Sequence, residues 1–345
     1  MNAEAKPERG APTVHFVYPR DPSKTSSPWC IGNELGDRLS RKYPTRFYGW
    51  RDELRIDAQP GDVLLGHPHW SRRSVFKRSL SHPNFARRLL LAPYVGDPRQ
   101  VAFHDTVIDQ CDLFLTITGG YWFQRVGESP MRRWWPKMRH LDLAVNRSHF
   151  PLLKTRFNPA GARRFVYIGH TARNKNVGYL SQLQRSGPDI PLHWIGRGRG
   201  RIPGLTALGF MDFRQPLAQD TLASFDFMVT VGATDANPTT ILESLAWGLI
   251  PVCSPQSGYE NSPGIVNLPL NDPDAAVAVL RHLNHCDESE LLQLRQQGEQ
   301  QLAAHYHWDR FFAQVDAAIQ GHDSPALRAA TWGEALSLWR HNLFH

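Results

Sequence analysis

Residues 227–253 of the 345-residue chain have the sequence FMVTVGATDANPTTILESLAWGLIPVC. The stretch begins with an apolar run of strand length, Phe227–Val231, and ends with a second one, Ile250–Cys253. A helical pattern lies between them, as parallel neighbours require, since a tight turn cannot connect parallel strands. Both runs are continuously apolar, which is typical of strands covered on both faces. The stretch therefore predicts a strand–helix–strand unit of a buried parallel sheet.

The ends of the central helix carry their own signals. Asn237 is a good N-cap, and Pro238 suits the first helical position, where no N–H donor is needed. Gly248 is a natural terminator after Trp247. We therefore expect a short helix that starts directly after a loop carrying Asp235.

The residues at this helix start are suited to bind an anion and a diol. Thr239 and Thr240 would present hydroxyls and free backbone N–H groups, which bind anions at helix starts. Glu243 lies one turn deeper, where a single carboxylate can accept both hydroxyls of a vicinal diol such as a ribose. A second interpretation stays open, in which Glu243 merely favours the helix dipole.

Strand-length apolar runs continue on both sides of this unit. They are Val14–Tyr18, Thr45–Trp50, Asp62–Gly66, Arg88–Ala92, Leu113–Thr118, Phe165–Ile168 and Leu192–Ile195. Helical patterns lie between and after them, for example Val177–Gln184, Asp220–Ser224 and Glu288–Ile319. The turn-rich basic stretch Lys154–Arg164 separates two series of strands. We expect an α/β protein of two tandem doubly wound domains, residues 1–157 and 158–322, followed by the segment 323–345.

Composition narrows the class of protein. Hydrophobic residues make up 41% of the chain and charged residues 21%, which is typical of globular and not of disordered chains. Apolar runs such as Leu89–Pro93 are far shorter than the ~20 residues of a membrane-spanning helix. The segment Met1–Pro12 has charges of both signs and no apolar core, so we expect no secretory signal and a cytoplasmic location.

The cysteines and the charges give two further expectations. The four cysteines, Cys30, Cys111, Cys253 and Cys286, are far apart, which favours reduced thiols over a disulfide framework or a metal site. Residues 1–150 hold 23 Lys and Arg against 15 Asp and Glu, whereas the remainder holds 16 against 17. This asymmetry indicates an anionic partner of the first domain or a solvated basic surface.

The stretch 227–253 resembles the signature of glycosyltransferase family four, whose members use nucleotide-sugars and retain the anomeric configuration. That signature is an acidic residue, seven intervening residues and a Glu, then a small-residue helix, a Gly and a buried Pro-Val strand. Asp235, Glu243, Gly248, Pro251 and Val252 stand at these positions. Phe165–Asn176, Leu192–Gly198, Leu208–Phe210 and Tyr306–Trp308 follow in family order, so the likeness covers about half the chain.

The resemblance implies a GT-B fold, in which two Rossmann-like domains face a cleft. It places the nucleotide-sugar donor on the second domain and the acceptor on the first. It also implies that a C-terminal helix, over Ala326–His345, packs back on the first domain.

The resemblance also implies roles for single residues. Lys175 would meet the donor diphosphate, Glu243 the ribose hydroxyls, and Asp235 the hydroxyls of the transferred sugar. Backbone N–H groups of Asn237–Thr240 would complete the diphosphate site, so no metal or other cofactor is expected. Gly169, Arg173 and Gly196 are further donor-binding candidates. The nucleobase, whether of a UDP-, GDP- or ADP-sugar, stays open.

The sequence departs from the family pattern at His170, where the family usually has Arg; Asp235 replaces a Glu, and Asn237-Pro238 a Gly-containing turn. His170 is a candidate catalytic residue together with Asp235 and Lys175, but an imidazole is only partly protonated near neutral pH. Arg173 could supply the missing charge. Otherwise donor binding is weak or pH-dependent, or the chain is a degenerate member that binds a nucleotide-sugar or glycan without turnover.

The first domain offers candidates for acceptor binding. Gly32 lies in the loop Ser26–Asn33, ahead of a helix that runs to about Arg41, although an ordinary loop-to-helix junction has the same pattern. His67 and His69 follow the run Asp62–Leu65, and without a third ligand they favour a polar loop over a metal pair. Tyr94 and Asp97 stand where the family's His is missing, and are the remaining candidates.

Two basic stretches, Arg72–Leu80 and Arg132–Arg139, bear on the acceptor. The second interleaves cations with Trp134 and Trp135, which suits a membrane surface or an anionic lipid-linked acceptor. A solvated basic face with partly buried indoles is the alternative. No nucleic-acid motif accompanies them, so nucleic acid is not an expected partner.

We therefore expect a metal-independent glycosyltransferase that moves a hexosyl or related sugar to a glycan, a lipid-linked glycan or a small molecule. A non-catalytic binding protein of the same fold is the second hypothesis. A dehydrogenase-like nucleotide binder is disfavoured, because the glycines of Gly196–Gly200 lack the spacing and the following acidic residue of a dinucleotide loop.

Overall fold

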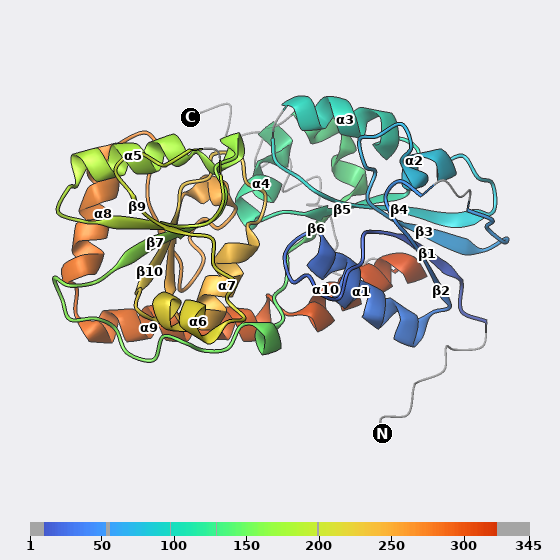
Figure 1. Cartoon of the computed structure of the whole chain (residues 1–345). Coiled ribbons are helices and arrows are strands. Elements are labelled where there is room, and N and C mark those ends of the chain that lie inside the picture. Colours follow the sequence, from blue (N-terminus) through green and yellow to red (C-terminus); the bar gives the residue numbers. More distant parts are fainter. Residues whose placement is uncertain (1–9, 53–55, 97, 129, 199, 323–345) are drawn as a thin grey trace, which may run out of the picture. The chain divides into compact units, whose positions relative to one another are not determined.

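The structure, a computed structural model, describes residues 10–52, 56–96, 98–128, 130–198 and 200–322. The chain forms two compact units, each built on its own parallel sheet (Figure 1). Unit 1 takes the chain up to Thr118, Trp122–Leu143 and the part from Trp308 on, and unit 2 takes Gly119–Tyr121 and Ala144–His307. The expected α/β architecture of two doubly wound sheets is confirmed.

The sheet of unit 1 has the strand order β2-β1-β3-β4-β5-β6, with all neighbours parallel. Its strands are β1 (Val14–Val17), β2 (Thr45–Tyr48), β3 (Asp62–Gly66), β4 (Phe85–Pro93), β5 (Leu113–Ile117) and β6 (Met138–Leu141). Its longer helices are α1 (Trp29–Lys42), α3 (Pro98–Ile108) and α10 (Trp308–Gln320), with the short α2 (Val75–Ser79), α4 (Gly120–Gln124), η1 (Arg125–Glu128) and η2 (Pro130–Lys137). In Figure 1, α2 and α3 cover one face of this sheet, and α1 and α10 the other.

The sheet of unit 2 has the order β12-β11-β10-β7-β8-β9, again with parallel neighbours. Its strands are β7 (Phe165–Ile168), β8 (Leu192–Ile195), β9 (Thr206–Gly209), β10 (Phe227–Thr230), β11 (Ile250–Cys253) and β12 (Val266–Asn267). Its helices are α5 (Val177–Ser186), α6 (Pro216–Ala223), α7 (Thr239–Trp247), α8 (Pro273–His285) and α9 (Glu288–Ala304), with the short η3 (Arg147–His149), η4 (Arg173–Lys175) and η5 (Pro255–Ser257).

Both sheets reverse their winding direction once. In unit 2 the chain runs outward from β7 through β8 to β9 and then returns to β10 on the other side of β7. In unit 1 it leaves β1 for β2 and returns to β3 on the other side of β1. Open α/β sheets bind ligands beyond the carboxyl ends of the strands at such switch points. The fold therefore marks the ends of β7 and β10, and of β1 and β3, as binding positions.

All the strands expected from the sequence are present, and most of them are apolar and buried, although β2 has exposed residues. Every residue of β1, β3, β5, β7, β10 and β11 is buried. Three strands were not expected. β9 is an exposed edge strand, β12 has two residues, and β6 lies at the end of a stretch that its charges marked as basic surface.

The expected helical region Glu288–Ile319 forms two helices that serve different units. α9 belongs to unit 2, whereas α10 packs on α1 of unit 1. Lys42 Nζ lies 2.8 Å from Asp316 Oδ2, and Arg38 Nε donates to Asp309 Oδ1 at 2.9 Å. The expected helix over Ala326–His345 lies outside the described residues. The division of the chain at residues 157 and 158 stays a prediction.

Candidate functional site

An ion pair links the loops that follow β7 and β10. Lys175 lies on η4, after β7, and Asp235 lies in the loop between β10 and α7. The Lys175 ammonium donates to the Asp235 carboxylate, and their side chains are 15% and 14% exposed. The two loops are also joined by their backbones, because Ala233 N–H donates to Asn174 O at 3.1 Å. The switch point of unit 2 thus holds a preformed, partly buried pair of opposite charges.

Glu243 adds a second carboxylate to this pair. It lies on α7, and burial raises its pKa to about 7, although a hydrogen bond from Thr239 and the charge of Lys175 act in the opposite direction. Near neutral pH the side chain is therefore close to its midpoint between carboxyl and carboxylate. Hydroxyl donors from a ligand would favour the charged form.

The N-terminus of α7 differs from the expected arrangement. Pro238 and not Asn237 occupies the capping position, and no side chain caps the helix. The expectation for Asn237 was wrong because its Oδ1 accepts a hydrogen bond from the Tyr259 hydroxyl instead. Asn237 is 8% exposed, and its Nδ2 has no hydrogen-bond partner among the described residues. A buried amide donor thus lies beside a helix start, with the half-buried Thr239 and Thr240 next to it. As expected, Gly248 ends the helix in the left-handed conformation, at φ 85°.

Gly169 and Gly196 bring the ends of β7 and β8 into contact. Trp194 Nε1 donates to Gly169 O at 2.9 Å. A Cβ on Gly196 would lie 1.9 Å from the same oxygen, so only glycine fits there. Packing of one loop on the other explains Gly196, and a role of either glycine in donor binding stays a prediction.

His170 lies at the edge of this site and is exposed. Its Nδ1 accepts a hydrogen bond from Ala172 N–H at 3.2 Å. Partial burial and the charge of Lys175 lower its pKa, while Asp235 acts the other way. Arg173 is also exposed and shares the short helix η4 with Lys175. The imidazole is therefore neutral at physiological pH, unlike the Arg that the family pattern has at this position.

The switch point of unit 1 is lined by aromatic rings. Trp50 follows β2, and its ring centroid lies 4.8 Å from that of His67 and 5.1 Å from that of His69. Tyr18, which follows β1, lies edge-on to both Trp50 and His67 at 5.9 Å. Trp50 Nε1 and His67 Nδ1 are buried without hydrogen-bond partners among the described residues. We call Tyr18, Trp50, His67 and His69 the aromatic cluster.

Both histidines of the aromatic cluster are neutral. Burial, together with the charges of His104 and His69, lowers the pKa of His67 to about 3. Burial and the charges of Arg51 and Lys77 lower the pKa of His69. The two histidines were expected from the sequence, but Trp50 and Tyr18 were not. Their signal was present, since each ends an expected strand at the carboxyl edge of the sheet.

The other acceptor candidates are less accessible. Tyr94 is completely buried in the core of unit 1, and Asp97 lies outside the described residues. Gly32 is inside the first turn of α1 and not in the preceding loop, which corrects the expected helix start. A Cβ on Gly32 would lie 1.9 Å from Pro19 O, so close packing of α1 on the loop after β1 explains this glycine. Acceptor roles of these residues stay predictions.

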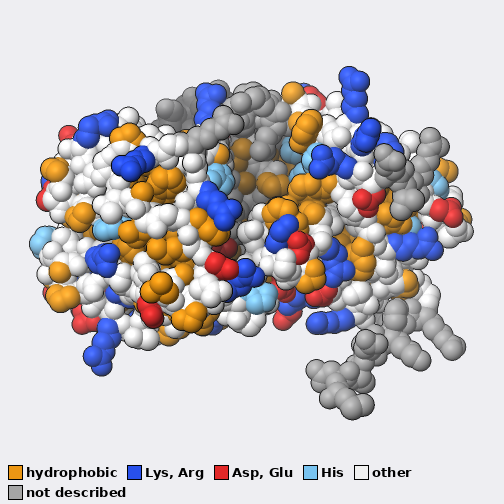
Figure 2. Space-filling model, in the orientation of Figure 1, with side chains coloured by type: hydrophobic (Ala, Val, Ile, Leu, Met, Phe, Trp, Pro, Cys, Tyr) orange, Lys and Arg blue, Asp and Glu red, His pale blue; other side chains and the backbone are white. Residues whose placement is uncertain are grey.

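The two basic stretches are partly structural. Trp134 is 3% exposed in the core of unit 1, and Arg139 is buried in β6, so neither faces solvent. In the first stretch, Arg72 and Arg73 are exposed beside Trp70, which is 75% exposed. Figure 2 shows Lys and Arg side chains scattered over the visible face among other types. Within the described ranges, no helix has both the length and the apolar character needed to cross a membrane.

By sequence, no family model and no curated protein matches this chain. Solved structures do match it. The catalytic domain of starch synthase IV from Arabidopsis thaliana, bound to ADP and acarbose, has a TM-score of 0.65 at 9% identity, with 90% of this chain and 99% of that chain covered. A UDP-forming α,α-trehalose-phosphate synthase from Burkholderia vietnamiensis has a TM-score of 0.63 at 11% identity, with 90% and 99% covered. A glycosyltransferase from Rickettsia africae has a TM-score of 0.62 at 10% identity, with 90% and 98% covered.

At these identities the likeness establishes the fold, and membership of family four stays a prediction. The match extends over nearly the whole length of the similar chains, so it includes both sheets and the helices around them. The chain has the GT-B fold of these glycosyltransferases.

Proposed function

We propose that this protein is a glycosyltransferase that moves a hexosyl or related sugar from a nucleotide-sugar donor to an acceptor. The observation that carries the proposal is the gathering of Lys175, Asp235 and Glu243 at the switch point of unit 2, beside the start of α7. A cation, a helix start and two carboxylates suit a ligand that presents a diphosphate and several hydroxyls. Similar solved structures include one bound to ADP and one described as UDP-forming, which supports this class of ligand.

In this proposal the charged groups exchange partners when the donor binds. The Lys175 ammonium leaves Asp235 and pairs with the diphosphate. Asp235 then accepts hydrogen bonds from hydroxyls of the transferred sugar. Glu243 accepts the two ribose hydroxyls. The leaving diphosphate gains negative charge, which Lys175 and the N–H groups at the start of α7 stabilise, so the reaction needs no metal ion. Retention of the anomeric configuration is proposed on the resemblance to family four.

Asn237 has a specific place in this scheme. Its Oδ1 is held by Tyr259, which fixes the amide so that Nδ2 is the group left to donate. A buried donor without a partner costs about 1–3 kcal/mol. A phosphate or sugar oxygen of the donor would remove that cost, so Asn237 would favour the bound state.

We propose the aromatic cluster of unit 1 as the acceptor site. Flat rings with a few polar atoms suit a sugar, because its C–H faces pack on rings and its hydroxyls hydrogen-bond. Trp50 Nε1 and His67 Nδ1 are buried polar atoms without partners among the described residues, so an acceptor would reach them when the rings of the cluster move apart. The acceptor class would be a glycan, free or lipid-linked. A cytoplasmic location, with Arg72 and Arg73 near a membrane surface, is part of this proposal.

A non-catalytic binding protein is the second candidate, and one observation favours it. His170 is exposed and neutral at the place where the family pattern has Arg. The site therefore lacks the permanently charged side chain with which that Arg would bind the diphosphate. Such a protein would bind a nucleotide-sugar without breaking its glycosidic bond.

A nucleotide screen followed by a hydrolysis assay separates these candidates. Thermal unfolding would be followed with UDP, GDP, ADP and their sugar conjugates, without metal, for the wild type and for Glu288→Gln as a surface carboxylate control. A ligand that binds the folded state raises the midpoint by mass action. Stabilisation with slow hydrolysis of the same sugar conjugate supports the transferase. Stabilisation without hydrolysis supports the binding protein, and no response to any nucleotide contradicts both.

A further inference from the structure

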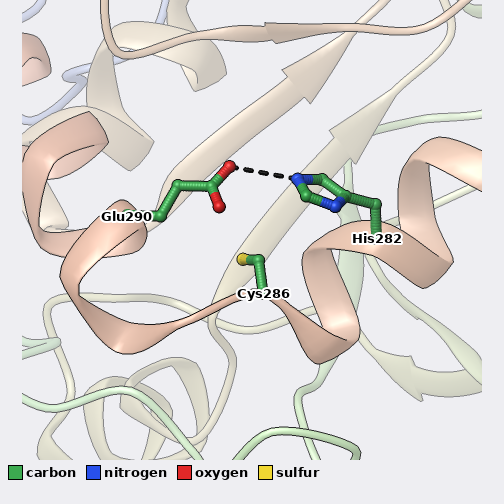
Figure 3. A group of neighbouring side chains, drawn as sticks. All are labelled: His282, Cys286 and Glu290. Atoms are coloured by element: carbon green, nitrogen blue, oxygen red, sulfur yellow. Dashed lines mark hydrogen bonds and ion pairs between the residues drawn. The ribbon is translucent and has the colours of Figure 1, made fainter.

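Three metal-ligating side chains meet where α8 ends and α9 begins. His282 lies on the last turn of α8, Cys286 follows the end of that helix, and Glu290 lies on the first turn of α9 (Figure 3). The possible ligand atoms all lie within 4.8 Å of one another. His282 Nε2 is already 3.0 Å from Glu290 Oε1. The spacing of four residues between successive members brings them together across the corner.

The three side chains differ in their contact with solvent. The side chains of His282 and Glu290 are 62% and 47% exposed, whereas Cys286 is 8% exposed. A cation could therefore approach from solvent while its sulfur ligand stays protected. An exposed His–Glu pair alone would bind a metal weakly, and the thiol is what makes this group selective.

The chemistry of the three groups favours zinc. Imidazole nitrogen, thiolate sulfur and carboxylate oxygen are the zinc ligands of proteins, with Zn–S near 2.3 Å and Zn–N and Zn–O near 2.0–2.2 Å. Tetrahedral geometry then needs ligand atoms about 3–4 Å apart, which small side-chain rotations reach from the present spacing. Calcium and magnesium prefer oxygen-only sites, so the sulfur disfavours them.

Arg163 supports the sulfur from the protein side. Its Nη1 lies 3.2 Å from Cys286 Sγ and also donates to Leu283 O at 2.7 Å. Arg163 is 4% exposed, so it is fixed in the interior behind the thiol. Burial raises the pKa of the Cys286 thiol, and the hydrogen bond and charge of Arg163 act in the opposite direction. Hydrogen bonds from outside the ligand set also orient metal ligands. Zinc, one thiolate and one carboxylate sum to zero charge, so the site adds no net charge beside Arg163.

We propose that His282, Cys286 and Glu290 bind one zinc ion, with water as the fourth ligand, and that this ion fastens α8 to α9. Binding breaks the S–H bond of Cys286, forms a Zn–S bond and releases the proton to solvent. The site stabilises unit 2 and takes no part in sugar transfer. Arg163 and Leu283 lie at the amino end of β7, whereas Lys175 and Asp235 follow the carboxyl ends of β7 and β10. The two sites therefore lie at opposite ends of the strands of one sheet.

Zinc titration of the full chain, stripped of metal and kept reduced, tests this proposal. We expect one equivalent of zinc to bind the wild type, and Cys286→Ala to weaken binding by at least about 100-fold, because even outer partners of a metal site contribute about 10–100-fold. Cys30→Ala, at a buried thiol of unit 1, and His285→Gln, on the same helix, are the matched controls and should bind as the wild type does. Equal binding by wild type and Cys286→Ala would overturn the proposal, as would a wild type that binds no zinc.

A second pair of measurements guards against a misfolded cysteine variant. His282→Gln alters an exposed side chain and should fold normally, yet zinc should raise the unfolding midpoint of the wild type and not of this variant. Cobalt in place of zinc should give a sulfur-to-metal charge-transfer band that Cys286→Ala lacks. A cobalt spectrum without this band in the wild type, or equal stabilisation of His282→Gln by zinc, would contradict the proposal.

Discussion

The switch points of the two units occupy the same place in sheets of similar topology, but their side chains differ in kind. In unit 2 the ends of β7 and β10 carry the ion pair of Lys175 and Asp235, with Glu243 beside it. In unit 1 the ends of β1, β2 and β3 carry the aromatic cluster, whose histidines are neutral. The fold fixes where a ligand binds, and the few residues after each strand determine which ligand. A charged site suits a nucleotide diphosphate, and an aromatic one suits a sugar.

Replacing Glu243 is the strongest test of this contrast. Glu243→Ala should lower nucleotide-sugar affinity by about 100-fold, because two hydrogen bonds to a charged acceptor contribute about 1.5 kcal/mol each. At neutral pH the unfolding midpoint should not fall, since burial disfavours the charged form of this carboxylate. Calorimetric titration and thermal unfolding measure the two effects. Comparable losses of stability and affinity would show that Glu243 is structural.

Lys175→Met should weaken binding of a nucleoside diphosphate by about tenfold, because it removes one charge from a partly buried site. Affinity for the nucleoside without phosphates should stay unchanged, which makes the nucleoside the internal control. Arg173→Met, on the same short helix but exposed, should have a smaller effect. Unchanged diphosphate affinity in Lys175→Met would remove this residue from the phosphate site.

Trp50→Phe tests the proposed role of the aromatic cluster of unit 1 in acceptor binding. It removes the buried Nε1–H and part of the ring surface of the aromatic cluster. We expect the acceptor KM to rise about fivefold while nucleotide affinity stays as in the wild type, because a single neutral hydrogen bond contributes about 1 kcal/mol. Trp308→Phe, at an indole of α10 whose ring contacts Phe311, is the matched control. A fall in nucleotide affinity with no change in acceptor KM would reverse the assignment of the two units.

The two units should also differ in how their stability depends on pH. Glu243 has a folded-state pKa of about 7, above its ordinary value of 4.5, so the stability it contributes is present below pH 4.5 and is lost as pH rises to 7. His67 has a folded-state pKa of about 3, below its ordinary value of 6.5, so its contribution is present above pH 6.5 and is lost as pH falls to 3.

The variants Glu243→Gln and His67→Phe should each remove one of these dependences. Unfolding midpoints measured from pH 4 to pH 8 would show the difference between Glu243→Gln and wild type growing with pH. The difference between His67→Phe and wild type should grow as pH falls. Parallel curves for wild type and either variant would contradict the corresponding pKa shift.

Much of the fold and part of the site could be predicted from the sequence. β7, β10 and α7 were predictable because their apolar runs and the terminating Gly248 depend on local sequence. β9 was missed because it is exposed, so hydrophobicity gives no signal there. The Asn237 cap was wrong because a hydrogen bond from Tyr259, distant in sequence, outcompetes a local one.

The chemistry of the aromatic cluster depends on contacts that no local pattern contains. Trp50 touches His67 and His69 past the end of β1, because β2 and β3 flank that strand in the sheet. The zinc ligands are close in sequence, but the thiol was interpreted by its distance from other cysteines. The neighbours of the Cys286 thiol are the imidazole of His282 and the carboxylate of Glu290, which the spacing of the cysteines alone does not reveal.

The return of α10 to unit 1 has a consequence for how the protein is made. Unit 1 starts first on the ribosome, yet the contacts of α1 with α10 join residues 271 and 274 positions apart. Residues 144–307 of unit 2 are continuous in sequence, so they can fold while unit 1 still lacks its last helix. The apolar side of α10, with Phe311 and Val315, covers its place in unit 1 only after synthesis has passed Gln320. The unit that is translated first is therefore completed last, and during that interval the apolar surface that α10 covers is exposed to aggregation.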